Sequence, residues 1–343
     1  MRSLRDHGLR IGRLEPGPRC SIADVAGVRV GHVTIVRDEP EPPDGRGVAR
    51  TGVTAVVPGA LPLRAGVAVL NGAGEMTGAM QIAEWGVLET HVYLTATMAV
   101  GRVFDGAVAA AVAADPTVGV DDVVIPVVAE CDDSWLSEAR VVQVEAADAG
   151  RAVAAAGDEF AEGAVGAGTG MVAFGFKGGL GSASRVVPDV GTVGVLVLAN
   201  FGSRHDLRVD GVPVGRRLGA TPVARPRPAG SCIVVVATDA SLQSAQLTRV
   251  ARRAGLGLAR TGSNAHHGSG EIFLALSTEP GADVPARGLD AVFEATVDAT
   301  EEAVLNALWS AERVEGRSGR VAEPLPHDAV LELLEAHRRL GVR

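Results

Sequence analysis

A serine stands at the boundary between two very different stretches of this chain. Residues 211–230 carry four prolines with arginines among them, whereas residues 231–237 read Ser-Cys-Ile-Val-Val-Val-Ala. Proline lacks the backbone N–H that a sheet ladder needs, so we expect an exposed linker followed by a buried strand. The first residue of that strand is Ser231, whose hydroxyl can act as a nucleophile.

A cut just before Ser231 would place a base beside this nucleophile. The freed α-amine has a reference pKa of about 7.7–8.0, and it could activate a hydroxyl that is otherwise weakly nucleophilic. No protease is needed, because Oγ can attack the Gly230 carbonyl and water can hydrolyse the resulting ester. Glycine permits the close approach that this attack requires. The sequence therefore predicts self-cleavage between Gly230 and Ser231, which yields chains 1–230 and 231–343.

Two other segments hold residues that such a site needs. Ser269 and Glu271 are two positions apart, so in extended backbone they share one face and can converge on one amine. Asn200 follows the apolar run 192–199, where its amide could donate to a developing oxyanion. Each has a plainer interpretation, because an asparagine after a strand is commonly a turn residue and Ser-Gly-Glu is an ordinary loop sequence.

Other catalytic signatures are missing or weak. The chain has no G-x-S-x-G, H-E-x-x-H or G-x-x-x-x-G-K-[ST] pattern. Residues 166–170 resemble a dinucleotide fingerprint only loosely. His266 and His267 would face opposite sides of an extended segment, and His205-Asp206 is typical of a solvated turn. We therefore expect neither a metal nor an organic cofactor.

Composition excludes several classes of protein. The 343 residues are 47% hydrophobic and 21% charged, which allows a large core and argues against disorder. A net charge of −9, with no cluster of arginines and aromatics, argues against nucleic acid as a partner. The length leaves one or two domains open.

The cysteines and the apolar runs suggest a compartment. Cys20, Cys131 and Cys232 match neither a disulfide framework nor metal-ligand spacing. The N-terminal residues lack a signal-peptide core, and no run of 18 uncharged apolar residues follows. We therefore expect a cytoplasmic protein without a membrane span.

Short β-branched runs alternate with alanine-rich stretches along the chain. Strands are predicted at 27–36, 51–58, 66–70, 121–128, 192–199 and 231–237. Helices are predicted at 74–85, 101–114, 139–157, 241–254, 289–312 and 326–340. The glycine-rich stretch 163–185, which contains the sole lysine Lys177, should be loop or closely packed backbone. The chain is thus a mixture of α and β elements with buried sheets.

Six blocks in order resemble the self-processing aminopeptidases typified by L-aminopeptidase D-Ala-esterase/amidase and the β-peptidyl aminopeptidases. They are 22–33 (IADVAGVRVGHV), 71–78 (NGAGEMTG), 174–185 (FGFKGGLGSASR), 195–202 (VLVLANFG), 230–240 (GSCIVVVATDA) and 268–273 (GSGEIF). The resemblance implies an α+β fold, a four-layer αββα sandwich of the N-terminal-nucleophile type. It also implies one catalytic domain over 1–343, cleaved into α (1–230) and β (231–343) chains, and a homo-oligomer, a tetramer of α/β pairs.

The resemblance also implies roles for individual residues. Ser231 matches the nucleophile after the cleaved Gly230, Asn200 matches the oxyanion asparagine, and Ser269 with Glu271 matches the pair beside the nucleophile's amine.

The segment 130–136 departs from the family pattern. The resemblance places Glu130 near the substrate's amino group, but Asp132 stands where the archetype has tyrosine. A further carboxylate would favour a cationic amino group and would also disturb the pKa of Glu130 by like-charge repulsion. The alternative is that Asp132 and Asp133 are simply solvated loop acids.

The sequence thus predicts a serine aminopeptidase that removes N-terminal residues from short peptides, amino-acid amides or esters. Two alternatives stay open. One is acyl transfer of the ornithine acetyltransferase type, which normally uses threonine as the nucleophile. The other is an uncleaved, non-catalytic binding homologue.

Overall fold

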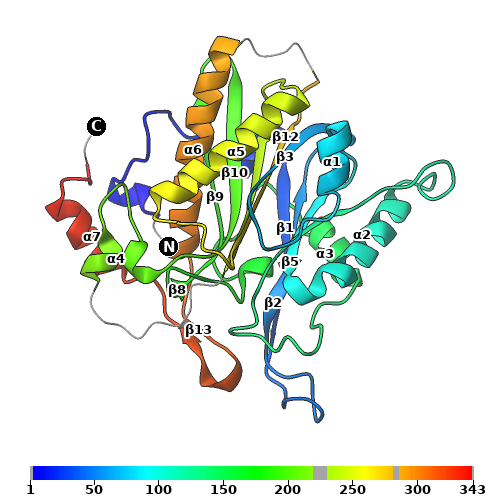
Figure 1. Ribbon diagram of the computed structural model, residues 1–343, viewed down its shortest axis with the longest axis horizontal. Coiled ribbons are helices and arrows are strands. Elements are labelled where there is room, and N and C mark those ends of the chain that lie inside the picture. The colour runs from blue at the N-terminus through cyan, green and yellow to red at the C-terminus, as the bar shows by residue number, and fades with distance from the viewer. Residues whose placement is uncertain (1–2, 219–229, 281–285, 342–343) are drawn as a thin grey trace.

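Two β-sheets stacked face to face form the centre of the molecule (Figure 1). The computed structural model describes residues 3–218, 230–280 and 286–341. The smaller sheet has the order β1-β2-β5-β6, with β1 at Arg29–Arg37, β2 at Ala49–Val57, β5 at Val92–Ala96 and β6 at Val127–Cys131. The larger sheet has the order β4-β3-β12-β11-β10-β9, with β4 at Val87–Leu88, β3 at Leu63–Gly72, β12 at Gly270–Ser277, β11 at Ser231–Thr238, β10 at Gly191–Asn200 and β9 at Gly179–Val187.

Helices cover the outer face of each sheet. The smaller sheet carries α2 (Val100–Ala114) and α3 (Ala147–Ala154), and the larger sheet carries α5 (Ser244–Arg260) and α6 (Ala286–Trp309). Around these layers lie α1 (Ala79–Trp85), α4 (Val214–Arg217), α7 (His327–Ala336) and the two-residue strand pairs β7–β8 (Val172–Ala173, Phe176–Lys177) and β13–β14 (Val314–Glu315, Val321–Ala322). The expected α+β class and four-layer αββα sandwich are confirmed.

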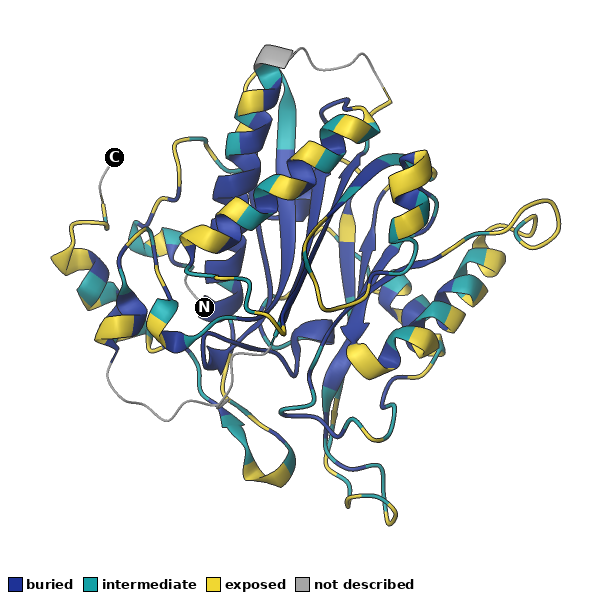
Figure 2. Ribbon diagram, viewed as in Figure 1, coloured by how far each residue is buried: buried dark blue, intermediate teal, exposed yellow. Residues whose placement is uncertain are grey.

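Strand β11 lies inside the larger sheet and is buried on both faces (Figure 2). Ile233 and Val235 belong to the apolar core between the two sheets, whereas Cys232 and Val234 belong to the core under α5 and α6. A strand covered on both sides reads as a continuous apolar run instead of an alternating one. The run 231–237 therefore predicts this strand correctly.

Several expected elements need corrected bounds. The strand expected at 121–128 is wrong over most of its length, because β6 begins at Val127 and Val123 and Ile125 are exposed in an irregular segment. The helix expected at 139–157 is confined to α3, where the Asp148 carboxylate accepts the Glu145 N–H at 2.7 Å just before the helix begins.

Other differences concern glycine- and proline-rich segments. The stretch 163–185 is not all loop, since β9 begins at Gly179. The exposed linker expected over 211–230 is wrong at its start, where α4 folds with Val214 buried in the core. Residues 219–229 lie outside the described residues, so the rest of that prediction stays a prediction. Strand β5 falls outside the expected strands altogether.

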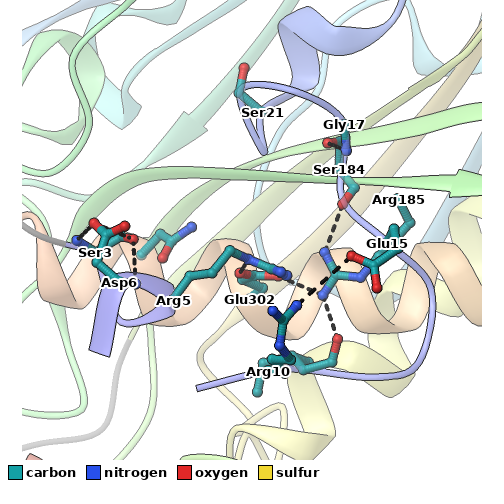
Figure 3. A network of polar contacts seen from close by, with 12 residues as sticks. Ser3, Arg5, Asp6, Arg10, Glu15, Gly17, Ser21, Ser184, Arg185 and Glu302 are labelled. Carbon is teal, nitrogen blue, oxygen red and sulfur yellow. Dashed lines mark hydrogen bonds and ion pairs between the residues drawn. The ribbon is translucent and has the colours of Figure 1, made fainter. Parts of the chain in front are cut away.

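Buried charges tie the start of the chain to the larger sheet and α6 (Figure 3). Arg5 donates two hydrogen bonds of 3.0 Å to Glu302 of α6, and the fully buried Arg185 of β9 forms an ion pair with the same carboxylate. Burial acts to raise the pKa of Glu302, but the two guanidinium groups outweigh it and lower the pKa. This carboxylate therefore links three segments that are distant in sequence.

One stretch, Thr97–Ala114, is long and apolar enough to cross a membrane by length and composition alone. It contains Arg102 and Asp105, and most of it forms α2, which lies over the smaller sheet. Val103 and Ala107 of this helix are buried in the core beneath it. Only 22% of the stretch is buried, so packing on the core accounts for part of its apolar character.

Candidate active site

Ser231, Asn200 and Gly270 lie side by side at one rim of the larger sheet. Asn200 is paired with Ser231 in the antiparallel ladder of β10 and β11, and Ser231 is paired with Gly270 in the parallel ladder of β11 and β12. The two pairings bring together residues that are 31 and 39 positions from Ser231 in the sequence. The register of three buried strands therefore decides which groups surround the serine.

The strand alternation separates the candidate side chains onto two faces of this rim. Ser231 shares a face with Ile233, and Asn200 shares one with Leu198, so both point toward the smaller sheet. Glu271 shares a face with Phe273, on the side of α5 and α6. The side chains of Ser231 and Asn200 thus lie on one face of the rim, while Glu271, which is paired with Cys232, lies on the other.

The Ser231 hydroxyl is buried and accepts no hydrogen bond within the described part of the chain. The thiol of Cys131, at the end of β6 in the facing sheet, lies next to it. Burial raises the pKa of Cys131 well above its usual value, so this thiol is neutral and cannot serve as a base. No side chain in the described residues is therefore engaged in activating Ser231.

The peptide bond before Ser231 is held closely. The Gly270 N–H donates to the Gly230 carbonyl at 3.2 Å. A Cβ on residue 230 would come within 2.0 Å of the Asn200 carbonyl oxygen, so the backbone leaves room for glycine alone. This carbonyl carbon is the atom that self-cleavage would attack, and a backbone donor already faces its oxygen.

The Asn200 amide is fixed by two hydrogen bonds. Its Oδ1 accepts the Val172 N–H at 3.0 Å, and its Nδ2 donates to the Asp132 carbonyl at 2.9 Å. An amide nitrogen carries two hydrogens, so one remains to donate to a further acceptor. The acceptor bond also fixes which end of the amide carries the donors.

Ser269 and Glu271 contact one another, and both are buried. The Ser269 hydroxyl donates to Glu271 Oε1, while Oε2 is buried without a hydrogen bond in the described residues. Burial raises the pKa of Glu271, and the bond from Ser269 partly offsets that rise. An unpartnered carboxylate oxygen at this position is suited to receive a newly freed amine, which a cut before Ser231 would supply.

Glu130 lies on β6, one residue before Cys131, and is 4% exposed. Thr97 donates its hydroxyl to Oε2, and the Glu75 N–H donates to Oε1 at 3.1 Å. A Cβ added to Gly74 would lie 3.1 Å from Glu130 Oε1 and 3.6 Å from the Cα of Gly270. The segment around Gly74 therefore bridges Glu130 to the serine rim. Burial raises the pKa of this carboxyl despite its two hydrogen bonds.

Asp132 and Asp133 differ in their surroundings. Asp132 accepts the Ser134 N–H at 2.8 Å through its carboxylate, and its carbonyl holds Asn200. Asp133 is buried, and burial raises its pKa to about 7. The alternative that both are solvated loop acids is therefore wrong for Asp133. A substrate contact for Asp132 stays a prediction.

Some groups at this rim could not be predicted from the sequence. Thr97, the Val172 N–H and the Gly270 N–H each form a hydrogen bond with a candidate residue or with the Gly230 carbonyl. Backbone donors carry no side-chain signal, so only the fold can reveal them. In the described ranges, no cluster of histidine, cysteine or acidic residues could hold a metal. His205, considered above as part of a triad, is exposed.

Comparisons with known proteins agree with this geometry. The model of "Peptidase family S58" matches residues 20–322. The chain is 41% identical to the "Beta-peptidyl aminopeptidase BapA" of Sphingosinicella microcystinivorans, with 95% of this chain and 90% of the relative covered. Two solved structures are similar over nearly their whole lengths. One is a beta-aminopeptidase from a Burkholderia species, with a TM-score of 0.90 and 42% identity, covering 100% of both chains.

The other solved structure is the L-aminopeptidase D-Ala-esterase/amidase of Ochrobactrum anthropi, described as a variant of the Ntn hydrolase fold. Its TM-score is 0.91 at 38% identity, and the match covers 98% of this chain and 99% of that one. The chain belongs to peptidase family S58, as an aminopeptidase of the N-terminal-nucleophile type.

Proposed function

We propose that this enzyme cuts itself before Ser231 and then removes N-terminal residues from short peptides, amino-acid amides or esters. The observation that carries the proposal is the buried Ser231 hydroxyl, which is unengaged, begins a central strand and follows a glycine that alone fits its position. No side chain in the described residues accepts a hydrogen bond from it, so we assign the base to the amine that the cut creates.

Self-cleavage begins with attack of Ser231 Oγ on the Gly230 carbonyl carbon. The oxyanion forms where the Gly270 N–H already donates. The Oγ proton passes to the Ser231 nitrogen as the C–N bond breaks, so that nitrogen leaves as an amine and Gly230 is held as an ester on Oγ. Water hydrolyses that ester, which frees the Gly230 carboxylate and restores the hydroxyl.

Turnover uses the same oxygen with its new base. The neutral Ser231 amine takes the proton from Oγ as Oγ attacks the substrate carbonyl, and the remaining N–H of Asn200 donates to the oxyanion. The amine returns its proton to the leaving group, and water releases the acyl group. Ser269 and Glu271 orient the amine from the opposite face of the rim.

The substrate's free ammonium is assigned to Glu130, whose buried carboxylate is anchored by Thr97 and by the Glu75 N–H. A charge-assisted bond of this kind contributes on the order of 1.5–3 kcal/mol. An aminoacyl nitroanilide should therefore be hydrolysed at least about tenfold faster than its N-acetyl counterpart, as measured by kcat/KM on one preparation. Equal rates for the two would describe a general amidase and contradict the assignment.

The Glu130→Gln variant separates recognition from chemistry. It should raise KM for the aminoacyl substrate about tenfold and leave the N-acetyl substrate unaffected, because only the former carries the cation. Glu84→Gln, an exposed change on α1, is the matched control and should change neither constant.

The same proposal includes a homo-oligomer in the cytoplasm. Val69, Leu70 and Leu256 are each more than half exposed, and Leu70 lies against Gly255 beside Leu256. An apolar patch of this kind is typical of a protein interface. The three cysteines are unpaired, which fits a reducing compartment. Sedimentation of the purified protein at the mass of a single chain pair would contradict the oligomer.

A further inference from the structure

Lys177, the sole lysine of the chain, is fully buried beside the segment that holds Asn200. Its Nζ donates to three backbone carbonyls, those of Gly168 at 2.9 Å, Met171 at 2.8 Å and Gly178 at 2.7 Å. No carboxylate forms an ion pair with it in the described part of the chain. A buried cation without a counter-ion is costly to keep, so its position calls for an explanation.

The three acceptors indicate the charge on Lys177. An ammonium has three N–H donors, which match the three carbonyls. A neutral amine has two, and its lone pair would then face the third carbonyl oxygen. Burial lowers the pKa of Lys177 to about 7, whereas the three carbonyl oxygens around Nζ favour its charged form.

One peptide group connects this ammonium to Asn200. The Met171 carbonyl accepts from Lys177 Nζ and from the Gly178 N–H. The nitrogen of the same peptide group belongs to Val172, and its N–H donates to Asn200 Oδ1 at 3.0 Å. The Asn200 amide in turn offers its remaining Nδ2 hydrogen at the serine rim. Two amide groups thus lie end to end between the ammonium and the expected oxyanion.

Hydrogen bonds arranged in such a chain polarise one another. A positive charge on the carbonyl side of the Met171–Val172 peptide makes its N–H a stronger donor. That stronger bond draws electrons toward Asn200 Oδ1 and leaves Nδ2–H a better donor in its turn. The effect is greatest when negative charge develops opposite Nδ2, as it does in the transition state.

We propose that Lys177 is a positioning residue that orients and polarises the Asn200 amide for oxyanion stabilisation during turnover. The inference rests on the proposed function, because it takes Asn200 as the oxyanion donor. Self-cleavage should not depend on Lys177, because the Gly230 oxygen faces the Gly270 N–H.

The test measures kcat and KM for an aminoacyl nitroanilide, per mole of cleaved chain, in Lys177→Met and Lys177→Gln. We expect both to fold and cleave, kcat to fall about tenfold and KM to stay within about twofold, since the effect is confined to the transition state. Arg204→Met is the matched control. Arg204, which follows β10, is another buried cation beside the β7–β8 pair, but it donates to the Gly175 carbonyl and lies over the Phe176 ring. Its loss should lower thermal stability with kcat unchanged.

A double-mutant cycle with Asn200→Ala tests whether Lys177 acts through Asn200. Asn200→Ala alone should lower kcat about 10²- to 10³-fold, and adding Lys177→Met should then cost less than about twofold. If Asn200→Ala does not cleave, the proposal is tested by comparing kcat of the Lys177 variants with kcat of Arg204→Met.

The outcomes separate the two proposals. Full kcat in the Lys177 variants, with loss in Asn200→Ala, overturns the inference alone. Full kcat in Asn200→Ala removes the oxyanion role from the proposed function and the inference with it. Loss of folding in both Lys177 variants, or a folded variant that stays uncleaved, would assign Lys177 a structural role and overturn the inference.

Discussion

Ser231→Ala should remain a single chain and lose hydrolysis of aminoacyl amides by about 10⁶-fold, the scale seen when the nucleophile of a serine hydrolase is removed. The unsubstituted protein should instead separate on a denaturing gel into chains 1–230 and 231–343. In the proposed mechanism Oγ performs both the cut and the turnover, and it is buried without a hydrogen-bond partner in the described residues.

N-terminal sequencing of the smaller chain tests the position of the cut. It should begin Ser-Cys-Ile, which places the free amine on the nucleophile itself. Gly230→Ala is an informative companion, because its methyl group would meet the Asn200 carbonyl and the cut should slow without loss of the hydroxyl. A protein that hydrolyses aminoacyl amides while it stays full-length would rule out the N-terminal mechanism.

Glu271→Ala should lower kcat by about 10²-fold or more while KM changes little, since it disturbs the general base and not substrate binding. Ser269 and Glu271 meet on the face of the rim opposite the Asn200 amide, and Glu271 Oε2 has no hydrogen bond in the described residues. In the proposed mechanism, the amine freed from Gly230 donates to this oxygen. The measurement is steady-state kinetics on protein whose cleavage has been verified by mass.

Glu332→Ala, an exposed change on α7, serves as the control and should leave kcat unaltered. Ser269→Ala should lower kcat as Glu271→Ala does, because it removes the hydroxyl that donates to Glu271 Oε1. Normal kcat in a fully cleaved Glu271→Ala protein would contradict the assigned role.

The glycine-rich stretch shows why local sequence is an incomplete guide to this fold. Residues 163–185 predict loop or closely packed backbone, because glycine has weak strand preference. Strand β9 nevertheless begins at Gly179, and a Cβ on Gly181 would meet the Ala303 carbonyl oxygen of α6 at 2.0 Å. Close packing of the helix on the sheet thus overrides propensity. The opposite error occurs at 121–128, where valines suggest a strand but no partner pairs with them before Val127.

The sequence by itself determined the prediction of Ser231 as the nucleophile and of a cut before it, because a Pro-rich segment, a glycine and a serine at the start of an apolar run are local features. The spacing of Ser269 and Glu271 likewise places both on one face wherever the backbone is extended. What only the tertiary structure decided is the register that sets Asn200 and Gly270 beside Ser231, and the division of the side chains between two faces of the rim. Pairing between strands distant in sequence depends on packing, which no local pattern encodes. The Val172 and Gly270 N–H donors and the setting of Lys177 emerge for the same reason, since backbone groups acquire a role only when the fold brings an acceptor to them.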